Sequence, residues 1–191
     1  MQRVCVFAGA NPGAREVYLA AARALGTEIA QRGMGMVYGG ASVGLMGACA
    51  DAALAGGAEV VGVLPRALAA REIGHPGLTE MRIVSSLHER KAVMSALSDA
   101  VVALPGGCGT LDELFEAITW AQLGLHQKPI GLLDAGDFYA PLFGFLEHIT
   151  AEGFVRPPLR LVRAGTAAGL LDGLFAAPPD AASPAGPAPR P

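Results

Sequence analysis

Residues 101–113 read VVALPGGCGTLDE. The first part, Val101–Leu104, is a short apolar run with two β-branched residues, which is typical of a buried strand. Residues 105–110 contain three glycines and predict a turn, and the pattern from Leu111 onward predicts a helix. A strand that passes through a glycine-rich turn into a helix is the repeating unit of open parallel α/β sheets.

The same unit recurs on both sides of this segment. Short apolar runs predict strands at Val4–Ala8, Met36–Tyr38, Val60–Leu64, Met81–Val84, Val101–Leu104 and Ile130–Leu133. Longer patterns predict helices at Arg15–Arg32, Leu45–Ala55, Leu87–Leu97, Leu111–Leu123 and Tyr139–Glu152. Because nearly continuous apolar strands alternate with helices, we predict a single-domain, Rossmann-like, doubly wound parallel sheet with helices on both faces. An eight-unit barrel is disfavoured, since it needs about 250 residues and this chain has 191.

Two segments do not fit the alternation. Pro65–Thr79 contains two prolines and two glycines and predicts a long loop, a kind of segment that is often functional. Residues 176–191 consist almost wholly of Ala, Pro, Gly, Asp and Ser. We therefore expect a folded domain over residues 1–175 and a disordered tail over residues 176–191.

The composition excludes several classes of function. With 52% hydrophobic and 16% charged residues, the chain is expected to be globular. The net charge is −3 without any basic cluster, so nucleic acid is not an expected partner. The three cysteines, Cys5, Cys49 and Cys108, are far apart, which indicates neither disulfides nor a metal site. No apolar run reaches the roughly 18 residues of a membrane span, and Val4–Ala10 is too short for a signal peptide. We therefore expect a cytoplasmic protein with no membrane partner.

Three glycine-rich turns follow predicted strands: AGANPG at 8–13, GGASVG at 39–44 and PGGCGT at 105–110. Open α/β sheets bind ligands beyond the carboxyl ends of their strands. Glycine lets backbone N–H groups approach an anion, and the helix that follows adds its own N–H groups and positive dipole end. We therefore predict a nucleotide or sugar-phosphate pocket, the alternative being that tight turns simply need glycine. The turns lack the Gly-Lys-Ser/Thr of a P-loop and the GxGxxG of a dinucleotide fold, which disfavours ATP hydrolysis and NAD chemistry.

Glu113 is the first candidate for catalysis. Thr110 and Glu113 have the spacing of a capping box that starts a helix. The functional interpretation is that Glu113 projects toward a sugar whose phosphate is held at the start of the same helix.

Two cations near the start of another predicted helix are also candidates. Ser86 and Glu89 have capping-box spacing, and Arg90 and Lys91 follow them directly. Positive charge at a helix start opposes the helix dipole at a cost of about 0.3–1 kcal/mol per residue. A bound anion would offset this cost, and solvated surface charge is the alternative.

With these motifs in view, the chain resembles the Lonely Guy (LOG) family of cytokinin riboside 5′-monophosphate phosphoribohydrolases, long misnamed lysine decarboxylases. Residues 105–113 match the family's PGGxGTxxE at every fixed position. Residues 90–94, RKAVM, match its RKxxM element, and residues 38–47, YGGASVGLMG, match its YGGxxxGLMG turn. The resemblance extends over roughly Val4 to Glu152 and keeps the motif order.

The resemblance implies roles for individual residues. Arg90 and Glu113 would form the catalytic pair at the ribose, and Gly107, Gly109 and Thr110 would bind the 5′-phosphate. Further substrate-binding residues implied by the motifs are Gly40, Gly44, Glu72, Lys91, Gly106, Cys108 and Thr119.

The first turn departs from the family pattern. The family has Gly-Ser-Ser or a close variant there, whereas this chain has Gly9, Ala10 and Asn11. The hydroxyl group at position 10 is missing, and Asn11 is the candidate to replace it. Cys108 occupies the variable position of PGGxGTxxE, where we expect a structural rather than a nucleophilic role.

The resemblance implies hydrolysis of the N-glycosidic bond of a purine nucleoside 5′-monophosphate, either AMP or an N6-modified form. The products would be the free base and ribose 5-phosphate, formed by a homodimer without metal or cofactor. One alternative is a non-catalytic nucleotide-binding or sensing module on the same fold, which needs neither Arg90 nor Glu113. The other is a lysine decarboxylase, which would need pyridoxal phosphate on one of only a few lysines.

Overall fold

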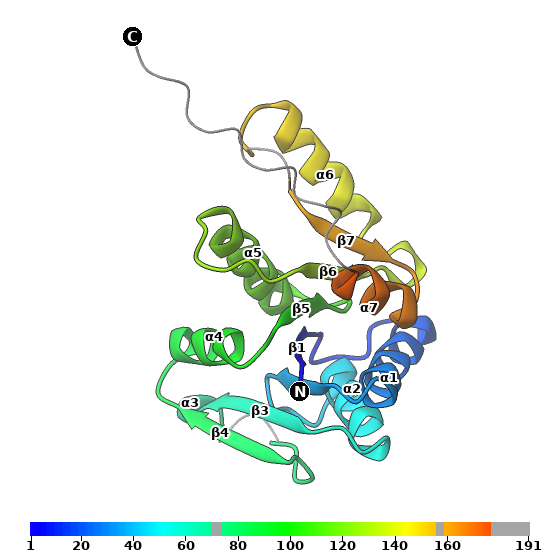
Figure 1. Cartoon of the computed structure of the whole chain (residues 1–191), viewed down its shortest axis with the longest axis vertical. Helices are drawn as coiled ribbons and strands as arrows, with labels where there is room; N and C mark the ends of the chain where they lie inside the picture. The colour runs from blue at the N-terminus through cyan, green and yellow to red at the C-terminus, as the bar shows by residue number, and fades with distance from the viewer. Residues whose placement is uncertain (70–73, 156–158, 177–191) are drawn as a thin grey trace.

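The computed structural model describes residues 1–69, 74–155 and 159–176, and these residues contain one sheet of seven parallel strands. The strands are β1 (Arg3–Phe7), β2 (Gly35–Tyr38), β3 (Val60–Pro65), β4 (Glu80–Val84), β5 (Ala100–Ala103), β6 (Ile130–Leu133) and β7 (Leu161–Ala164). Their order in space is β4-β3-β2-β1-β5-β6-β7 (Figure 1). The chain moves outward from β1 to β4, then returns to place β5 on the other side of β1. The order therefore reverses between β1 and β5, which confirms the doubly wound sheet.

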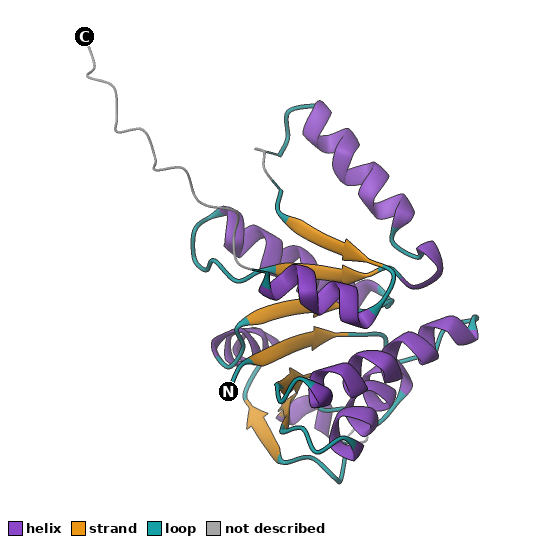
Figure 2. Cartoon of the chain, turned by 45° about the vertical axis from the view of Figure 1, so that its right-hand side comes forward, coloured by secondary structure: helices purple, strands orange, loops and turns teal. Residues whose placement is uncertain are grey.

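Helices cover both faces of the sheet (Figure 2). They are α1 (Glu16–Gln31), α2 (Gly44–Ala55), α3 (Arg66–Ala69), α4 (Leu87–Ala96), α5 (Cys108–Gln122), the 3-10 helix η1 (Ala135–Asp137), α6 (Ala140–Ala151) and α7 (Ala167–Phe175). Helices α1, α2 and α7 pack on one face, and α4, α5 and α6 pack on the other. None of the helices within the described ranges has the length and apolarity that a membrane crossing requires.

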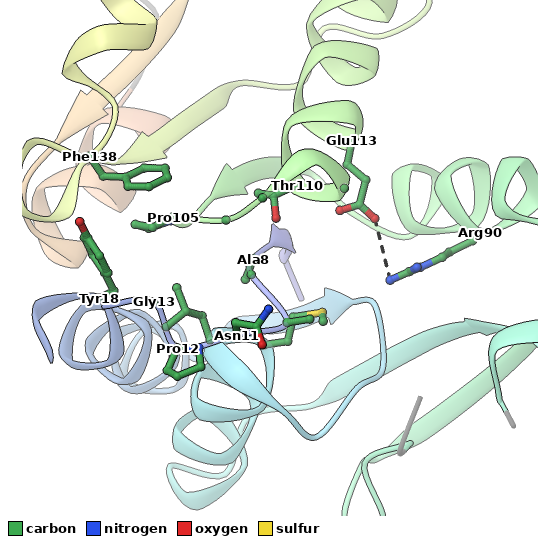
Figure 3. Close-up of a pocket in the computed structure, with 17 residues that line it drawn as sticks. Ala8, Asn11, Pro12, Gly13, Tyr18, Arg90, Pro105, Thr110, Glu113 and Phe138 are labelled. Atoms are coloured by element: carbon green, nitrogen blue, oxygen red, sulfur yellow. Dashed lines mark ion pairs between the residues drawn. The ribbon is translucent and has the colours of Figure 1, made fainter. Parts of the chain in front are cut away.

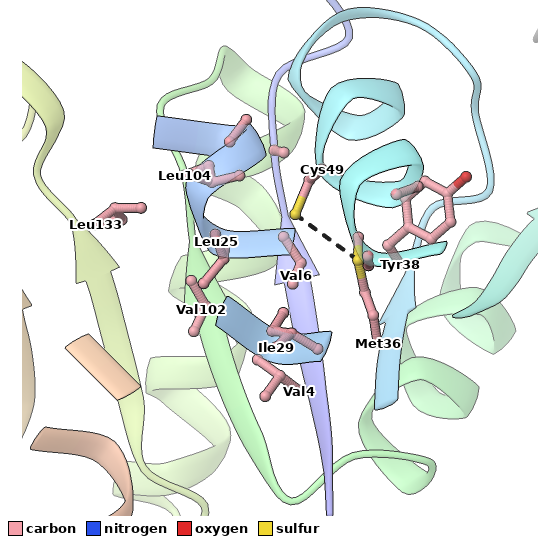
Figure 4. Packing of buried hydrophobic residues seen from close by; sticks show 14 of the residues in the cluster. Val4, Val6, Leu25, Ile29, Met36, Tyr38, Cys49, Val102, Leu104 and Leu133 are labelled. Atoms are coloured by element: carbon pink, nitrogen blue, oxygen red, sulfur yellow. Dashed lines mark hydrogen bonds between the residues drawn. The ribbon is translucent and has the colours of Figure 1, made fainter. Parts of the chain in front are cut away.

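The alternation of side chains along β1 divides the interior into two cores. Val4 and Val6 point into the core beneath α1 and α2, where they lie with Leu25 (Figure 4). Cys5 and Phe7 point into the core beneath α4, α5 and α6. Because both faces of the central strand are buried, its sequence is apolar at every position from Val4 to Phe7, as expected of a parallel sheet.

Several elements differ from the sequence predictions. No strand or helix was predicted after Glu152, yet β7 and α7 complete the sheet and its first face. Strand β7 lies at the sheet edge and is only partly buried, so its sequence lacks a continuous apolar run. The short helix α3 lies in the segment predicted as a loop. Within the predicted tail, Ala176 caps α7, and residues 177–191 lie outside the described residues.

Candidate active site

A cavity of about 390 Å³ opens at the point where the strand order reverses (Figure 3). It lies between the turn after β1, residues 8–13, and the turn after β5, residues 105–110. The two turns are joined directly, because the N–H group of Gly9 donates to the carbonyl oxygen of Pro105 at 3.1 Å. Side chains from α1, α2, α4 and α5 and from Phe138 complete the wall. This is the position at which open α/β sheets bind their ligands.

The N-terminus of α5 faces the cavity. The N-cap of this helix is Gly107, and its first hydrogen bond runs from the N–H group of Leu111 to the carbonyl oxygen of Gly107 at 3.1 Å. The N–H groups of residues 108–110 therefore precede the hydrogen-bonded part of the helix and carry its positive dipole end. The buried Thr110 directs its hydroxyl group into the cavity (Figure 3). Unpaired N–H groups and a positive dipole end at a helix start are the arrangement that commonly binds anions such as phosphate.

A glycine at position 106 is required for this geometry. A Cβ atom there would collide with the side chain of Thr110. Because α5 begins at Cys108, Thr110 lies inside the first turn and is not the N-cap, so the capping-box interpretation of Thr110 and Glu113 is wrong. The capping box of α4 is confirmed in part, because the N-cap Ser86 accepts a hydrogen bond from the N–H group of Glu89 at 3.1 Å.

The N-terminus of α2 is already occupied. The carbonyl oxygen of Gly9 accepts hydrogen bonds from the N–H groups of Leu45 at 2.9 Å and Met46 at 3.4 Å. This close approach needs glycine at position 44, where φ is +60° and a Cβ atom would overlap the backbone of Ala10. The N-terminus of α2 is therefore closed to an anion, whereas the N-terminus of α5 is open. Gly40 and Gly44, both predicted to bind substrate, are not among the residues that line the cavity.

Arg90 and Glu113 face each other at one end of the cavity. Arg90 comes from α4 and Glu113 from α5, and the guanidinium Nη2 and the carboxylate Oε1 are 3.9 Å apart (Figure 3). Their side chains are only 10% and 15% exposed. The pair contains opposite charges within contact distance, at a separation longer than a direct hydrogen bond.

The guanidinium of Arg90 packs closely against Gly39. A Cβ atom at Gly39, just after β2, would collide with Nη2 of Arg90, so the arginine occupies space that only glycine leaves. Among the described residues, the buried Nε atom of Arg90 has no hydrogen-bond partner. A buried donor of this kind is costly unless another group accepts from it. The Nε atom of Arg90 is therefore an unsatisfied polar group in the described part of the structure.

Lys91 points away from the cavity, toward the outer side of α5. Its Nζ atom contacts Asp112 at 2.9 Å and Glu116 at 3.1 Å. Burial lowers the pKa of Lys91, but the hydrogen bonds and charges of the two carboxylates outweigh burial and raise the pKa above its usual value. The positive charge of Lys91 is thus offset by two carboxylates of α5.

The remaining predicted substrate-binding residues lie elsewhere. Thr119 and Cys108 are exposed and line a shallow groove on the outer face of α5 together with Trp120. The hydroxyl group of Thr119 donates to the carbonyl oxygen of Phe115 at 2.7 Å. Glu72 lies outside the described residues.

Comparisons with known proteins place the chain in a family. A family model described as "Possible lysine decarboxylase" matches residues 46–167. The chain is 51% identical over 171 residues to the rice (Oryza sativa subsp. japonica) protein named "Probable cytokinin riboside 5′-monophosphate phosphoribohydrolase LOGL1", covering 88% of this chain and 77% of the relative. It is 49% identical over 158 residues to the cytokinin riboside 5′-monophosphate phosphoribohydrolase of Rhodococcoides fascians, covering 82% and 80%.

The chain belongs to the LOG family of phosphoribohydrolases.

A solved structure shows how widely this fold is shared. The molybdenum cofactor binding protein of Rippkaea orientalis superimposes on the LOG-family chain with a TM-score of 0.68 and 23% identity, covering 90% of this chain and 93% of that one. At this level of identity the likeness concerns the fold alone.

The lysines of this LOG-family protein do not fit a decarboxylase site. The chain has two lysines. Lys91 is paired with carboxylates of α5, and Nζ of Lys128 donates to the carbonyl oxygen of Ser95. Neither lines the cavity, so neither is placed to form a Schiff base with pyridoxal phosphate there. The described residues also contain no cluster of three metal-ligating side chains.

Two aromatic residues line the cavity although no pattern in the sequence indicated them. Tyr18 of α1 and Phe138 after η1 form the end opposite Glu113 (Figure 3). Phe138 follows β6, the strand beside β5, so its proximity depends on the order of strands in the sheet. In contrast, Asn11, the candidate to replace the missing hydroxyl group, does line the cavity.

Proposed function

We propose that this chain hydrolyses the N-glycosidic bond of AMP or of an N6-modified adenosine 5′-monophosphate and releases the free base and ribose 5-phosphate. The observation that carries the proposal is the Arg90–Glu113 pair beside the open N-terminus of α5, within one cavity. The names of relatives that share about half of its sequence support the same reaction.

The 5′-phosphate binds at the start of α5. The backbone N–H groups of residues 108–110, the hydroxyl group of Thr110 and the helix dipole supply hydrogen bonds and positive potential. In this arrangement, phosphate binding needs neither a lysine nor a metal ion. Binding energy gained at the phosphate is available to hold the sugar against Glu113, because remote contacts can support the transition state at the reacting bond.

Glu113 acts at the anomeric carbon. As the bond between C1′ and the base nitrogen breaks, the electron pair leaves with the base, and the sugar acquires oxocarbenium character. The nearby carboxylate stabilises this positive charge and orients a water molecule. The water oxygen bonds to C1′, one of its protons is lost, and the departing base takes up a proton. The balance is one water consumed for one base and one ribose 5-phosphate formed.

Arg90 positions the sugar. Its guanidinium is almost buried, and its Nε donor has no partner among the described residues. A ribose hydroxyl or phosphate oxygen accepts a hydrogen bond from the part of the guanidinium that lines the cavity. Such contacts hold the ribose in the orientation required for attack, which is the role of fixed hydrogen-bond donors in most enzyme sites.

The deciding experiment compares two monophosphates, AMP and isopentenyladenosine monophosphate, with the corresponding nucleosides. Free base and ribose 5-phosphate are quantified by chromatography. We expect release from the monophosphates only, and its loss in Glu113→Gln, which keeps the side-chain shape but removes the charge. The matched control is Glu147→Gln on the exposed surface of α6, which should retain full activity. Equal cleavage of the nucleosides, or full activity in Glu113→Gln, contradicts the proposal.

We further propose that the chain is a homodimer joined through the outer face of α5. This face carries a groove that includes Phe115 and Trp120, and just beyond the helix Leu123 and Leu125 are each 69% exposed. Exposed apolar side chains of this kind are typical of protein interfaces. Sedimentation should give twice the mass of the chain, and Leu123→Glu together with Leu125→Glu should shift it to the monomer. A monomeric native protein contradicts this proposal.

A further inference from the structure

We propose that Tyr18 and Phe138 form a wall that restricts the 5′ group of the substrate to a single phosphate. This inference rests on the proposed nucleotide hydrolase function. The two rings line the end of the cavity opposite Glu113, with the N-terminus of α5 between the two ends (Figure 3). They meet edge to face, with centroids 5.6 Å apart and planes at 76°.

The wall is held rigidly from both sides. The guanidinium of Arg15 lies over the ring of Tyr18, 5.5 Å from its centroid, and its Nη1 donates to the carbonyl oxygen of Gly136 at 2.8 Å. This contact ties α1 to η1 across the cavity end. The ring of Phe138 also packs edge to face against the buried Tyr139, with centroids 4.9 Å apart. Moving either ring aside therefore breaks aromatic packing, so a larger ligand can displace the wall only at a cost in free energy.

The two side chains that form the wall, Tyr18 and Phe138, carry no charge themselves. Among the described residues that line the cavity, Arg90 is the one with a cationic side chain, and it lies at the opposite end. Arg15 is not a lining residue; its Nη1 atom donates to the carbonyl oxygen of Gly136 and lies 3.5 Å from the hydroxyl oxygen of Tyr18. A second phosphate beyond the start of α5 would lose water and meet aromatic rings in exchange. Burying a charge without a partner is strongly unfavourable.

A diphosphate cannot avoid the wall by sliding. If its terminal phosphate took the place at the start of α5, the ribose would be displaced by the length of one phosphate group. C1′ would then no longer lie beside Glu113, and misplacement by about 1 Å is enough to cost much of the rate. The wall thus fixes where the 5′-phosphate binds relative to the catalytic pair, Arg90 and Glu113.

The test measures kcat/KM for AMP and ADP in the wild-type protein and in three variants. We expect the wild type to prefer AMP by roughly 100-fold. Phe138→Ala and Tyr18→Ala should each narrow this preference by about tenfold or more, because removing a ring opens space for solvated phosphate. Tyr18→Phe, which keeps the ring and removes only the hydroxyl group, is the matched control and should retain the preference. Using two alanine variants guards against one of them failing to fold.

The outcomes separate this inference from the proposed function. Base release from AMP by the wild type tests the hydrolase function on its own. If no base is released, the dissociation constants of AMP and ADP, measured by calorimetry, still test the wall. Their ratio in the wild-type protein is then compared with their ratio in the same three variants. Equal kcat/KM values, or equal dissociation constants, for the two nucleotides in the wild type overturn the inference. An unchanged preference for AMP in both alanine variants also overturns it.

Discussion

Gly39 sets the position of Arg90. A Cβ atom at this residue would collide with Nη2 of the guanidinium, which also contacts Glu113 at 3.9 Å. We expect Gly39→Ala to displace the guanidinium and to lower kcat/KM by about 100-fold, since misplacing a catalytic group by about 1 Å has effects of that size. Steady-state kinetics with AMP, beside circular dichroism to confirm folding, provides the measurement.

Gly144→Ala on α6 is the matched control for this substitution. Nothing lies within 4 Å of a Cβ atom at position 144. Alanine in a helix is more favourable than glycine by up to about 1 kcal/mol, so this variant should be slightly more stable and fully active. A folded Gly39→Ala protein with undiminished activity would contradict the role assigned to Gly39.

Tyr139 supports the turn that follows β5. Its buried hydroxyl group donates to the carbonyl oxygen of Leu104 at 2.6 Å, directly before the turn at 105–110. Tyr139→Phe should lower the free energy of unfolding by about 0.5–1.5 kcal/mol. By loosening the proposed phosphate site, it should also raise KM more than it lowers kcat. Urea unfolding and kinetics measure the two effects. Thr150→Val, which removes the side-chain hydrogen bond to Leu146 on α6, should affect stability without raising KM.

For single residues, the sequence predicts which side chains are candidates for catalysis or binding better than it predicts which side chains they contact. The segment 105–113 and Arg90 were identified as candidates because their residue types and spacing have a direct physical meaning. The partners of Lys91 were not foreseen, because Asp112 lies 21 residues away and meets it only through the packing of α4 against α5. A local pattern contains no information on that contact.

At the scale of elements, α1 and α2 approach each other through Gly26. A Cβ atom there would collide with the carbonyl oxygen of Cys49 and lie 2.9 Å from the backbone nitrogen of Ala53. Gly26→Ala should therefore push the helices apart and lower the free energy of unfolding by about 1–3 kcal/mol, despite the better helix propensity of alanine. Chemical denaturation of this variant, compared with Gly144→Ala, tests the expectation, and equal stability of the two variants would disprove it.

The strands that could be predicted from the sequence are those with helices packed on both faces. Strands such as β1 and β5 are apolar throughout because helices cover both of their faces. Strand β7 has one exposed edge and contains Arg163, so its pattern is weak. The start of α5 was predicted three residues too late, at Leu111, because the glycine-rich turn conceals the first helical turn. Glycine is an unfavourable helix former, yet here the helix begins within that turn.

At the scale of the whole molecule, topology decides the position of the cavity. Two glycine-rich turns far apart in sequence meet because β1 and β5 are neighbours, and the hydrogen bond between Gly9 and Pro105 fixes them together. That a cavity lies beyond the strand ends was predictable from the strand–turn–helix pattern. The aromatic wall of Tyr18 and Phe138 was not, since it requires the order of β1, β5 and β6 and the packing of α1 against η1.

The stability of the molecule should decrease in alkaline solution through its buried thiols. Burial raises the pKa of Cys49 from 9.0 to about 12 and also raises that of Cys5. A thiol whose pKa is higher in the folded than in the unfolded state favours folding fully below the unfolded pKa. This contribution is lost as the pH rises from about 9 towards 12, because the unfolded chain releases the proton first. Each such group contributes a slope of up to about 1.4 kcal/mol per pH unit.

Urea unfolding under reducing conditions, at intervals from pH 7 to about pH 11, measures this slope. Cys49→Ala leaves a cavity and should lower the stability at pH 7, yet its stability should fall less steeply above pH 9 than that of the wild type. Cys108→Ala, which removes an exposed thiol, should retain the wild-type decline. A parallel decline in all three proteins would show that ionisation of the thiol buried between α2 and β2 does not couple to folding.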